Sequence, residues 1–215
     1  MIREMALSVL LGLAACQTVV PVAAPVRPLF AEDFSGVDAV PETLLVFNGD
    51  FSVGTEVGNK FLELPSTLTD QYGIMFGPTT NAGVTASARF QGTRRGRLDP
   101  AFGVGLNGVG GFRLMVSPAK RKLELLKGDA AVVAVDFVWV SGKWTHVKLQ
   151  TRALGVGVWQ VEGKAWMEGQ PEPRAWNLVW KETAEPAAGR ASVWASPYSG
   201  APIRLDDFCV SPVVP

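Results

Sequence analysis

The chain contains few side chains that could carry out catalysis. It has one histidine, His146, and two cysteines, which excludes sites that need two imidazole groups or a Cys-x-x-Cys pair of metal ligands. A serine triad would have to use His146, but this residue lies in the middle of an alternating, strand-like segment, and no Gly-x-Ser-x-Gly elbow is present. We therefore assign no catalytic residue from the sequence.

A glycine-rich segment, residues 103–108, matches the dinucleotide fingerprint Gly-x-Gly-x-x-Gly. The fingerprint binds a pyrophosphate only when a helix follows, because the amides at the start of that helix receive the phosphate. Residues 109–114 instead indicate a turn and a strand, so we predict a β connection and no nucleotide. The 20 basic and 20 acidic residues leave no net charge, which disfavours nucleic acid as a partner, and the cluster Arg94, Arg95 and Arg97 is typical of a solvated loop.

Aromatic residues in the second half of the chain could bind a sugar. A carbohydrate site needs an aromatic face for the apolar side of a pyranose ring, edged by polar groups that bind the hydroxyls. All seven tryptophans lie between positions 139 and 194. We expect Trp194, Tyr198 and Trp166 to be exposed and to bind the ligand. The alternative is burial, since tryptophan is highly buried on average, and a core would readily accept Trp144, Trp159 and Trp180.

The chain beyond residue 28 breaks into short segments rich in Val, Phe, Trp and Leu, separated by Gly, Pro, Asn and Asp. This pattern is typical of an all-β protein, and about 200 residues suit one such domain. In residues 144–150, Val147 and Leu149 share one face while His146, Lys148 and Gln150 share the other, which indicates one buried and one solvated face. The predicted strands are residues 29–34, 44–53, 60–64, 73–76, 84–90, 112–116, 122–126, 131–138, 144–151, 158–166, 176–180, 191–194 and 203–210.

Residues 117–128 are the only serious helix candidate. They begin with a capping serine and a proline in the first turn, and they end with a glycine. We nevertheless favour a strand, a basic turn and a second strand, because residues 112–116 and 123–125 both alternate. A short helix is the alternative for this segment.

The N-terminal residues Leu13, Ala14, Ala15 and Cys16 close a short apolar run and resemble a bacterial lipobox. The resemblance implies that residues 1–15 are a lipoprotein signal peptide, that Cys16 carries the lipid, and that the protein is membrane-anchored in the cell envelope. An ordinary signal peptide cut at the same place is the alternative. The apolar run is too short to span a bilayer, for which roughly 20 residues are needed. The proline-rich residues 16–28 are typical of an extended tether.

Two features of the envelope interpretation depend on single residues. The residue after Cys16 is Gln17 and not the aspartate that retains enteric relatives in the inner membrane, so the resemblance favours the outer membrane. The second cysteine, Cys209, is then unpaired, and we expect it to be a small buried residue of the last strand. An intermolecular disulfide is the alternative for this thiol.

The two ends of the predicted domain, Phe30-Ala31-Glu32-Asp33-Phe34 and Leu205-Asp206-Asp207-Phe208-Cys209, resemble the first and last strands of concanavalin A-like lectin/glucanase domains. Residues 142–149 and 161–166 are similar to the Gly-x-Trp strand and Val-Asp-Gly-Lys turn of laminin-G-like domains. The resemblance covers residues 29–215. It implies a concanavalin A-like jelly-roll β-sandwich of two antiparallel sheets, in which the first and last strands pair. Related domains bind sugars, hydrolyse glycans or mediate adhesion.

The same resemblance implies a structural calcium ion at the rim of the sandwich. Asp33 or Glu32, Asp206 or Asp207, and a carbonyl near Gly49 could supply the oxygen ligands that calcium requires. Strand alternation allows only one acid of each pair to face a given side. The alternative is that these acids face solvent or pair with Arg204.

The sequence therefore predicts a lipid-anchored envelope protein whose β-sandwich binds a glycan or mediates adhesion without catalysis. A glycoside hydrolase related to glucanases or 3-keto-glycoside hydrolases is the enzymatic alternative, and a structural scaffold is the third. The Glu-x-Asp-x-Glu motif of the glucanases is absent, and the acids Glu162, Glu168 and Glu172 look like solvated surface residues.

Overall fold

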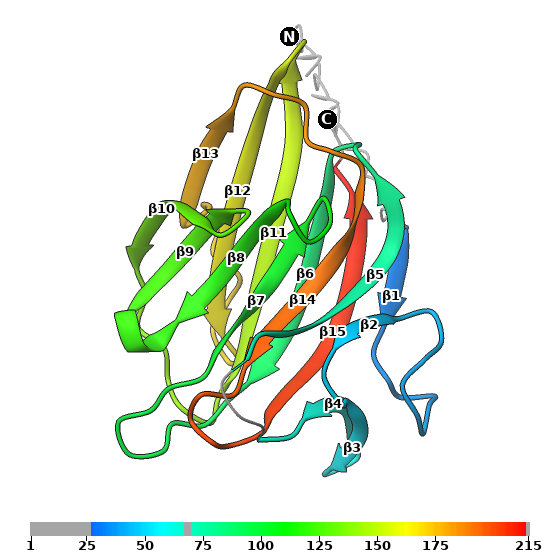
Figure 1. Cartoon of the computed structure of the whole chain (residues 1–215), viewed down its shortest axis with the longest axis vertical. Coiled ribbons are helices and arrows are strands. Elements are labelled where there is room, and N and C mark those ends of the chain that lie inside the picture. The colour runs from blue at the N-terminus through cyan, green and yellow to red at the C-terminus, as the bar shows by residue number, and fades with distance from the viewer. Residues whose placement is uncertain (1–26, 67–69, 214–215) are drawn as a thin grey trace, which may run out of the picture.

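The protein folds as a jelly-roll β-sandwich of two antiparallel sheets, which confirms the predicted fold class (Figure 1). The computed structural model describes residues 27–66 and 70–213. The predicted signal peptide, Cys16 and most of the predicted tether lie outside the described residues. No helix of the described part is long and apolar enough to cross a membrane.

Sheet A contains both ends of the domain. Its order is β13-β12-β11-β6-β15-β4-β3, and β1 also pairs with β15. The bounds are β1 (Phe30–Glu32), β3 (Ser52–Glu56), β4 (Asn59–Leu64), β6 (Val84–Gln91), β11 (Trp144–Gly155), β12 (Val158–Met167), β13 (Leu178–Glu182) and β15 (Ile203–Pro212).

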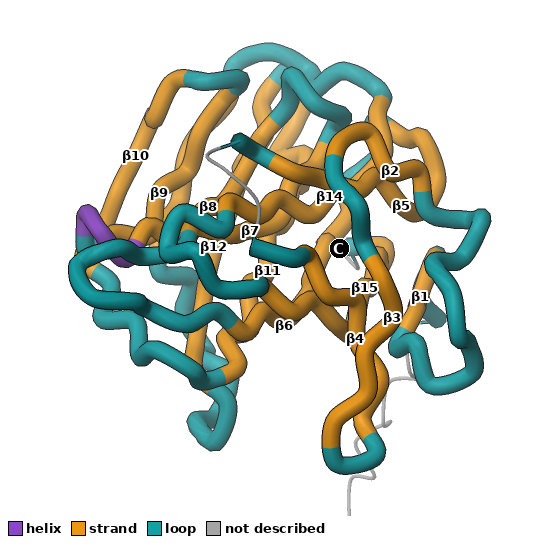
Figure 2. The backbone as a smooth tube through the Cα atoms, turned by 60° about the horizontal axis from the view of Figure 1, so that its bottom comes forward, coloured by secondary structure: helices purple, strands orange, loops and turns teal. Residues whose placement is uncertain are grey.

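Sheet B packs over sheet A and has the order β10-β9-β8-β7-β14-β5-β2. Its strands are β2 (Leu45–Asn48), β5 (Tyr72–Thr80), β7 (Ala101–Leu106), β8 (Phe112–Ser117), β9 (Lys122–Lys127), β10 (Ala130–Asp136) and β14 (Gly189–Ser196). Figure 2 shows the two layers and the loops that join them.

The core lies between the sheets and follows directly from strand alternation. In β6 every second residue, from Val84 to Phe90, is buried, and in β11 Val147 and Leu149 are fully buried as predicted. Phenylalanine rings dominate the centre, with Phe90 stacked on Phe102 of the opposite sheet at 5.1 Å between centroids. These contacts pack the two sheets against each other.

The two ends of the sandwich differ, and we name them by the residues they contain. The terminal end holds the start of β1 and the end of β15, because Phe30 lies opposite Val210, and Pro212 lies opposite Val84. The distal end is the opposite one, where β5 and β7 begin and β14 ends. The pairing of the first and last strands agrees with the expected jelly roll.

The structure refines the sequence predictions for three segments of the chain. Residues 44–53 form two strands in different sheets, because Gly49, with φ of 105°, turns the chain between them. The glycine-rich connection contains a strand, β7, whose glycines allow close packing: a Cβ on Gly103 would lie 1.9 Å from the carbonyl oxygen of Leu114. Residues 112–127 form β8, a single 3-10 turn (Pro118–Lys120) and β9, so the segment 117–128 is not the helix that was the alternative.

The hairpin between β3 and β4 stores backbone strain. Its two-residue turn places Val57 at φ 49° and Gly58 at φ 81°, and the Val57 side chain is fully exposed. Two positive φ values are typical of a type I′ turn, for which Asn-Gly is preferred, whereas a β-branched residue is poorly tolerated there.

Val57→Asn is therefore expected to raise the free energy of unfolding by about 1 kcal/mol, measured by urea denaturation, because asparagine adopts the left-handed region at lower cost. Val57→Ile keeps the β-branch and serves as the control. Equal stabilities of the two variants would contradict the strain interpretation.

Candidate ligand-binding site

The outer face of sheet B carries a cavity of about 230 Å³ at the distal end of the sandwich. Strands β8, β9, β7 and β14 form its floor, and the segments before β5, before β7, after β8 and after β14 form its walls. The lining residues are Gln71, Asp99, Pro100, Ala101, Met115, Ser117, Pro118, Ala119, Lys120, Glu124, Leu126, Ser196 and Tyr198. We call this cavity the distal groove.

Tyr198 supplies the exposed aromatic ring of the distal groove. It is 44% exposed, which confirms the predicted exposure of this residue. It follows β14 in a turn that Gly200 closes by donating its backbone N–H to the carbonyl of Pro197 at 2.9 Å. Met115 and Leu126 provide apolar surface beside it. The groove therefore combines one aromatic face with an apolar floor.

Ser196 is the most informative polar group in the distal groove. It is 1% exposed, and its hydroxyl oxygen has no hydrogen-bond partner. A buried hydroxyl without a partner costs about 1–3 kcal/mol. Ser196 lines the groove, and its hydroxyl oxygen lies beneath the groove surface.

Two carboxylates in the groove are already bound by basic side chains. Asp99 accepts two hydrogen bonds from the guanidinium of Arg94, one from Nε at 2.6 Å and one from a terminal nitrogen at 3.2 Å. Glu124 accepts two from Lys120 Nζ, at 3.1 and 3.2 Å. The rim therefore presents both hydrogen-bond donors and acceptors with little net charge.

The predicted exposure of Trp194 is wrong. This residue is only 4% exposed, because its ring packs against Phe47 at 5.0 Å and the Arg113 guanidinium lies 4.5 Å above it. Its indole N–H donates to the Ser192 hydroxyl at 2.9 Å. Arg113 is held in turn by hydrogen bonds to Gln71 and to the carbonyl of Gly128. Trp194 thus supports the outer face of sheet B without offering a sugar platform.

Trp166 is partly exposed but lies on the outer face of sheet A, away from the distal groove. Its ring stacks on His146 with centroids 5.0 Å apart and planes 9° apart. Lys148 and Glu172 border this pair and form an ion pair at 2.7 Å. Trp166 and Tyr198 therefore cannot form one platform.

The stacked His146 ring is half-buried, and burial lowers its pKa below the ordinary value of 6.5, against an opposing effect of Glu168. A lowered histidine pKa means that the unfolded chain binds the proton more readily than the native one. The contribution of the neutral His146 ring to the free energy of unfolding is therefore complete above pH 6.5. It is lost as the pH falls from 6.5 towards the pKa of His146 in the native protein.

We accordingly expect wild-type stability to decrease as the pH falls below 6.5, and His146→Gln to make this decrease smaller. Urea unfolding of both proteins on either side of that pH measures the difference. Identical pH profiles would show that His146 does not contribute.

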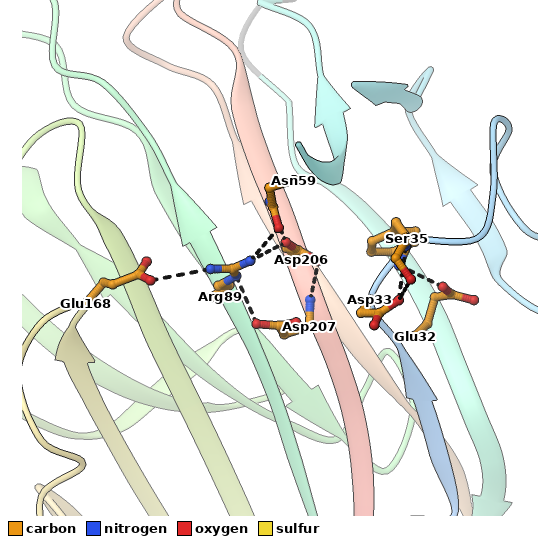
Figure 3. A network of polar contacts seen from close by, with 9 residues as sticks. Glu32, Asp33, Ser35, Asn59, Arg89, Glu168, Asp206 and Asp207 are labelled. Carbon is orange, nitrogen blue, oxygen red and sulfur yellow. Dashed lines mark hydrogen bonds and ion pairs between the residues drawn. The ribbon is translucent and has the colours of Figure 1, made fainter. Parts of the chain in front are cut away.

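The predicted calcium ligands do not form one coordination site (Figure 3). Asp206 is fully buried and binds Arg89 at 2.6 Å and Asn59 at 3.0 Å. Asp33 accepts the hydroxyl of Ser35 at 2.7 Å. Gly49 belongs to the turn after β2 in the other sheet and packs against Tyr72.

Among the described residues no group of three or more acidic, histidine or cysteine side chains could hold a metal ion. Calcium therefore stays a prediction for which the geometry offers no ligand set. Asp207 is instead drawn towards Arg89, with Oδ2 2.9 Å from Nε. Burial, together with the neighbouring Asp206, raises the pKa of Asp207.

A β-bulge explains why both adjacent acids reach Arg89. The register of β15 against β6 shifts between Asp206 and Cys209, and Asp207 has φ of 53°. Alternation therefore does not separate Asp206 from Asp207 as expected. The same shift turns Cys209 outward opposite Ser87, so it is partly exposed and not buried as predicted.

Glu162 also differs from its prediction as a solvated acid. It is 4% exposed and accepts hydrogen bonds from Gln150, Gln160 and Arg152. Like Asp206, it is a buried acid paired on the outer face of sheet A. Arg204 pairs with Glu56 and Glu63.

Arg89→Met would leave the buried carboxylate of Asp206 without its cation, and we expect it to lower the free energy of unfolding by about 3–5 kcal/mol. Urea denaturation measures the loss. Lys122→Met is the control: it removes an exposed ion pair with Asp136 and should leave the free energy of unfolding nearly unchanged. A loss no larger than that control would show that Asp206 is solvated or differently paired.

No family model matches the chain, and no curated protein matches its sequence. Solved structures do match its fold. The carbohydrate-binding module CBM66 from Bacillus subtilis is 11% identical, with a TM-score of 0.54 over 79% of this chain and 95% of that one. The carbohydrate recognition domain of Emp46p, in its metal-free form, is 9% identical, with a TM-score of 0.63 over 89% of this chain and all of that one.

Enzymes share the fold as well. A xylan β-1,4-xylosidase from Bacillus halodurans is 12% identical with a TM-score of 0.56, and this chain, of which 90% aligns, covers 41% of that protein. At such identities the similarity shows the fold alone. The structure therefore belongs to the class of jelly-roll β-sandwiches found in carbohydrate-binding domains and in some glycosidases and lyases.

Sequence reasoning missed the polar half of the distal groove. Ser196 and Glu124 come from separate strands, and nothing in their local sequence marks them as neighbours. One signal was available: Ser192, Trp194 and Ser196 alternate with apolar residues, which places all three on one face of β14.

Proposed function

We propose that this protein is a lipid-anchored envelope protein whose β-sandwich binds a glycan in the distal groove without catalysis. The observation that carries the proposal is the unpartnered, buried hydroxyl of Ser196 in a groove whose exposed ring is Tyr198. A sugar offers both an apolar ring face for Tyr198 and hydroxyls for Ser196. The carbohydrate-binding structures with the same fold support this proposal.

The size and chemistry of the groove favour a small part of a glycan. Its 230 Å³ lies somewhat below the 300–1,000 Å³ typical of pockets for drug-sized ligands, which suits about one sugar residue. Lys120 and Gln71 can donate to sugar oxygens, while Glu124 and Asp99 can accept from sugar hydroxyls. The groove is open, so longer chains can extend into solvent.

Hydrolysis is the second candidate, because Asp99 and Glu124 line the same groove. A glycosidase needs one carboxylic acid kept protonated to donate to the leaving group, and a second carboxylate opposite it. Here each carboxylate accepts hydrogen bonds from a basic side chain, Arg94 or Lys120. This pairing favours binding over bond cleavage.

Anchoring is a proposal from the lipobox-like residues that end at Cys16. The residues 17–28 are proline-rich and would connect the lipid to β1. Two acyl chains hold a protein far more firmly than one, as expected for a diacylglyceryl-modified cysteine. Placement in the outer membrane is likewise proposed from Gln17.

Binding of the full chain to a broad glycan array tests the function. We expect Tyr198→Ala to weaken binding about fivefold or more, because aromatic anchors commonly contribute more than 1 kcal/mol at a binding site. Ser196→Ala should weaken it as well, through loss of one hydrogen bond.

Trp166→Ala is the matched control, since it removes a partly exposed ring from the other sheet. Loss of binding with this variant and not with Tyr198→Ala would move the site to sheet A. Absence of binding to any glycan would contradict the proposal. Release of reducing sugar, abolished by Glu124→Gln, would favour the hydrolase.

A further inference from the structure

The hairpin that joins β11 and β12 carries an exposed apolar tip. Leu154 is 44% exposed, Val156 is fully exposed and Val158 is 42% exposed. Gly155 and Gly157 flank Val156 on either side, and residues 153–158 include no charged side chain. Single exposed apolar residues are ordinary, but three on one projecting turn form a local apolar surface. We call residues 153–158 the hairpin tip.

Strand register places the hairpin tip at the terminal end of the sandwich. Leu149 of β11 lies opposite Ala86, which lies opposite Val210, which in turn lies opposite Phe30. The tip, the start of β1 and the end of β15 therefore point the same way, and Figure 1 shows the hairpin projecting beyond β15. Three strand spacings, about 14 Å, separate β11 from β1.

The chain that precedes the domain can reach the surface that the hairpin tip would touch. Val156 lies seven residues beyond Leu149, which corresponds to about 20 Å past the level of Phe30. Residues 17–28 can extend over about 40 Å. A lipid on Cys16 and the hairpin tip could therefore meet the same bilayer.

We propose that the hairpin tip inserts into a lipid bilayer and orients the domain on it. The tip extends about 7 Å from Leu154 to Val156, which agrees with the 5–10 Å depth of interfacial insertion. The distal groove lies at the opposite end, so this orientation directs Tyr198 away from the membrane. The inference does not depend on glycan binding, but the choice of a bilayer as the partner rests on the proposed lipid anchor at Cys16.

The test uses the full chain with Cys16→Ser, so that no acyl chain contributes, and phosphatidylcholine vesicles. The protein should float with the vesicles, and binding should change little with salt because the hairpin tip is uncharged. Val156→Asp should lower the partition coefficient by about tenfold or more, whereas Val156→Trp should raise it. Val156 is fully exposed, so neither variant disturbs packing.

Val57→Asp is the matched control, because Val57 is also fully exposed on a hairpin turn. That hairpin, β3–β4, projects from a different part of sheet A (Figure 2). The control should bind vesicles like the parent protein. No flotation of the parent, or equal losses for Val57→Asp and Val156→Asp, would overturn the proposal. Unchanged flotation with loss of a dimer in Val156→Asp would show that the tip contacts a second copy instead.

Discussion

The burial of Asp206 is the constraint on which sheet A depends. This carboxylate is fully buried in β15, the strand that pairs with β1, β4 and β6, so its charge must be compensated where it lies. Arg89 on β6 supplies that charge and also contacts Asp207 and Glu168. The same guanidinium lies 4.7 Å above Trp144 of β11. One basic side chain thus links the central strands to the loop after β12.

The outer faces of the two sheets are built on different principles. On sheet A, polar groups pair with one another, as Glu162 and Asp206 do with their basic partners, and little hydrogen-bonding capacity is left for a ligand. On sheet B, the glycines in β7 add no side chains to the outer face, and the Arg113 guanidinium lies above the Trp194 ring. The distal groove forms beside this region, and Ser196 there has no protein partner. This contrast favours sheet B as the ligand-binding face.

The fold could be predicted from the sequence because strand alternation and turn residues are local properties. Val147 and Leu149 were placed correctly for that reason. The position of Trp194 could not be, since its burial depends on Phe47 and Arg113, which come from distant strands. The bulge at Asp207 could not be predicted from the sequence either, and it places the Cys209 side chain on the outer face of sheet A instead of the inner one. Ser196 became a candidate only once β14 lay beside the segments that complete the groove.

The pairing of β1 with β15 has a mechanical consequence. Three residue pairs, from Phe30 opposite Val210 to Glu32 opposite Phe208, join the first strand to the sandwich. If the N-terminal side is held and a ligand pulls at the distal end, tension runs along the strands. The hydrogen bonds of β1 are then loaded together in shear and not broken one after another. The attachment can therefore carry force although its first strand is short.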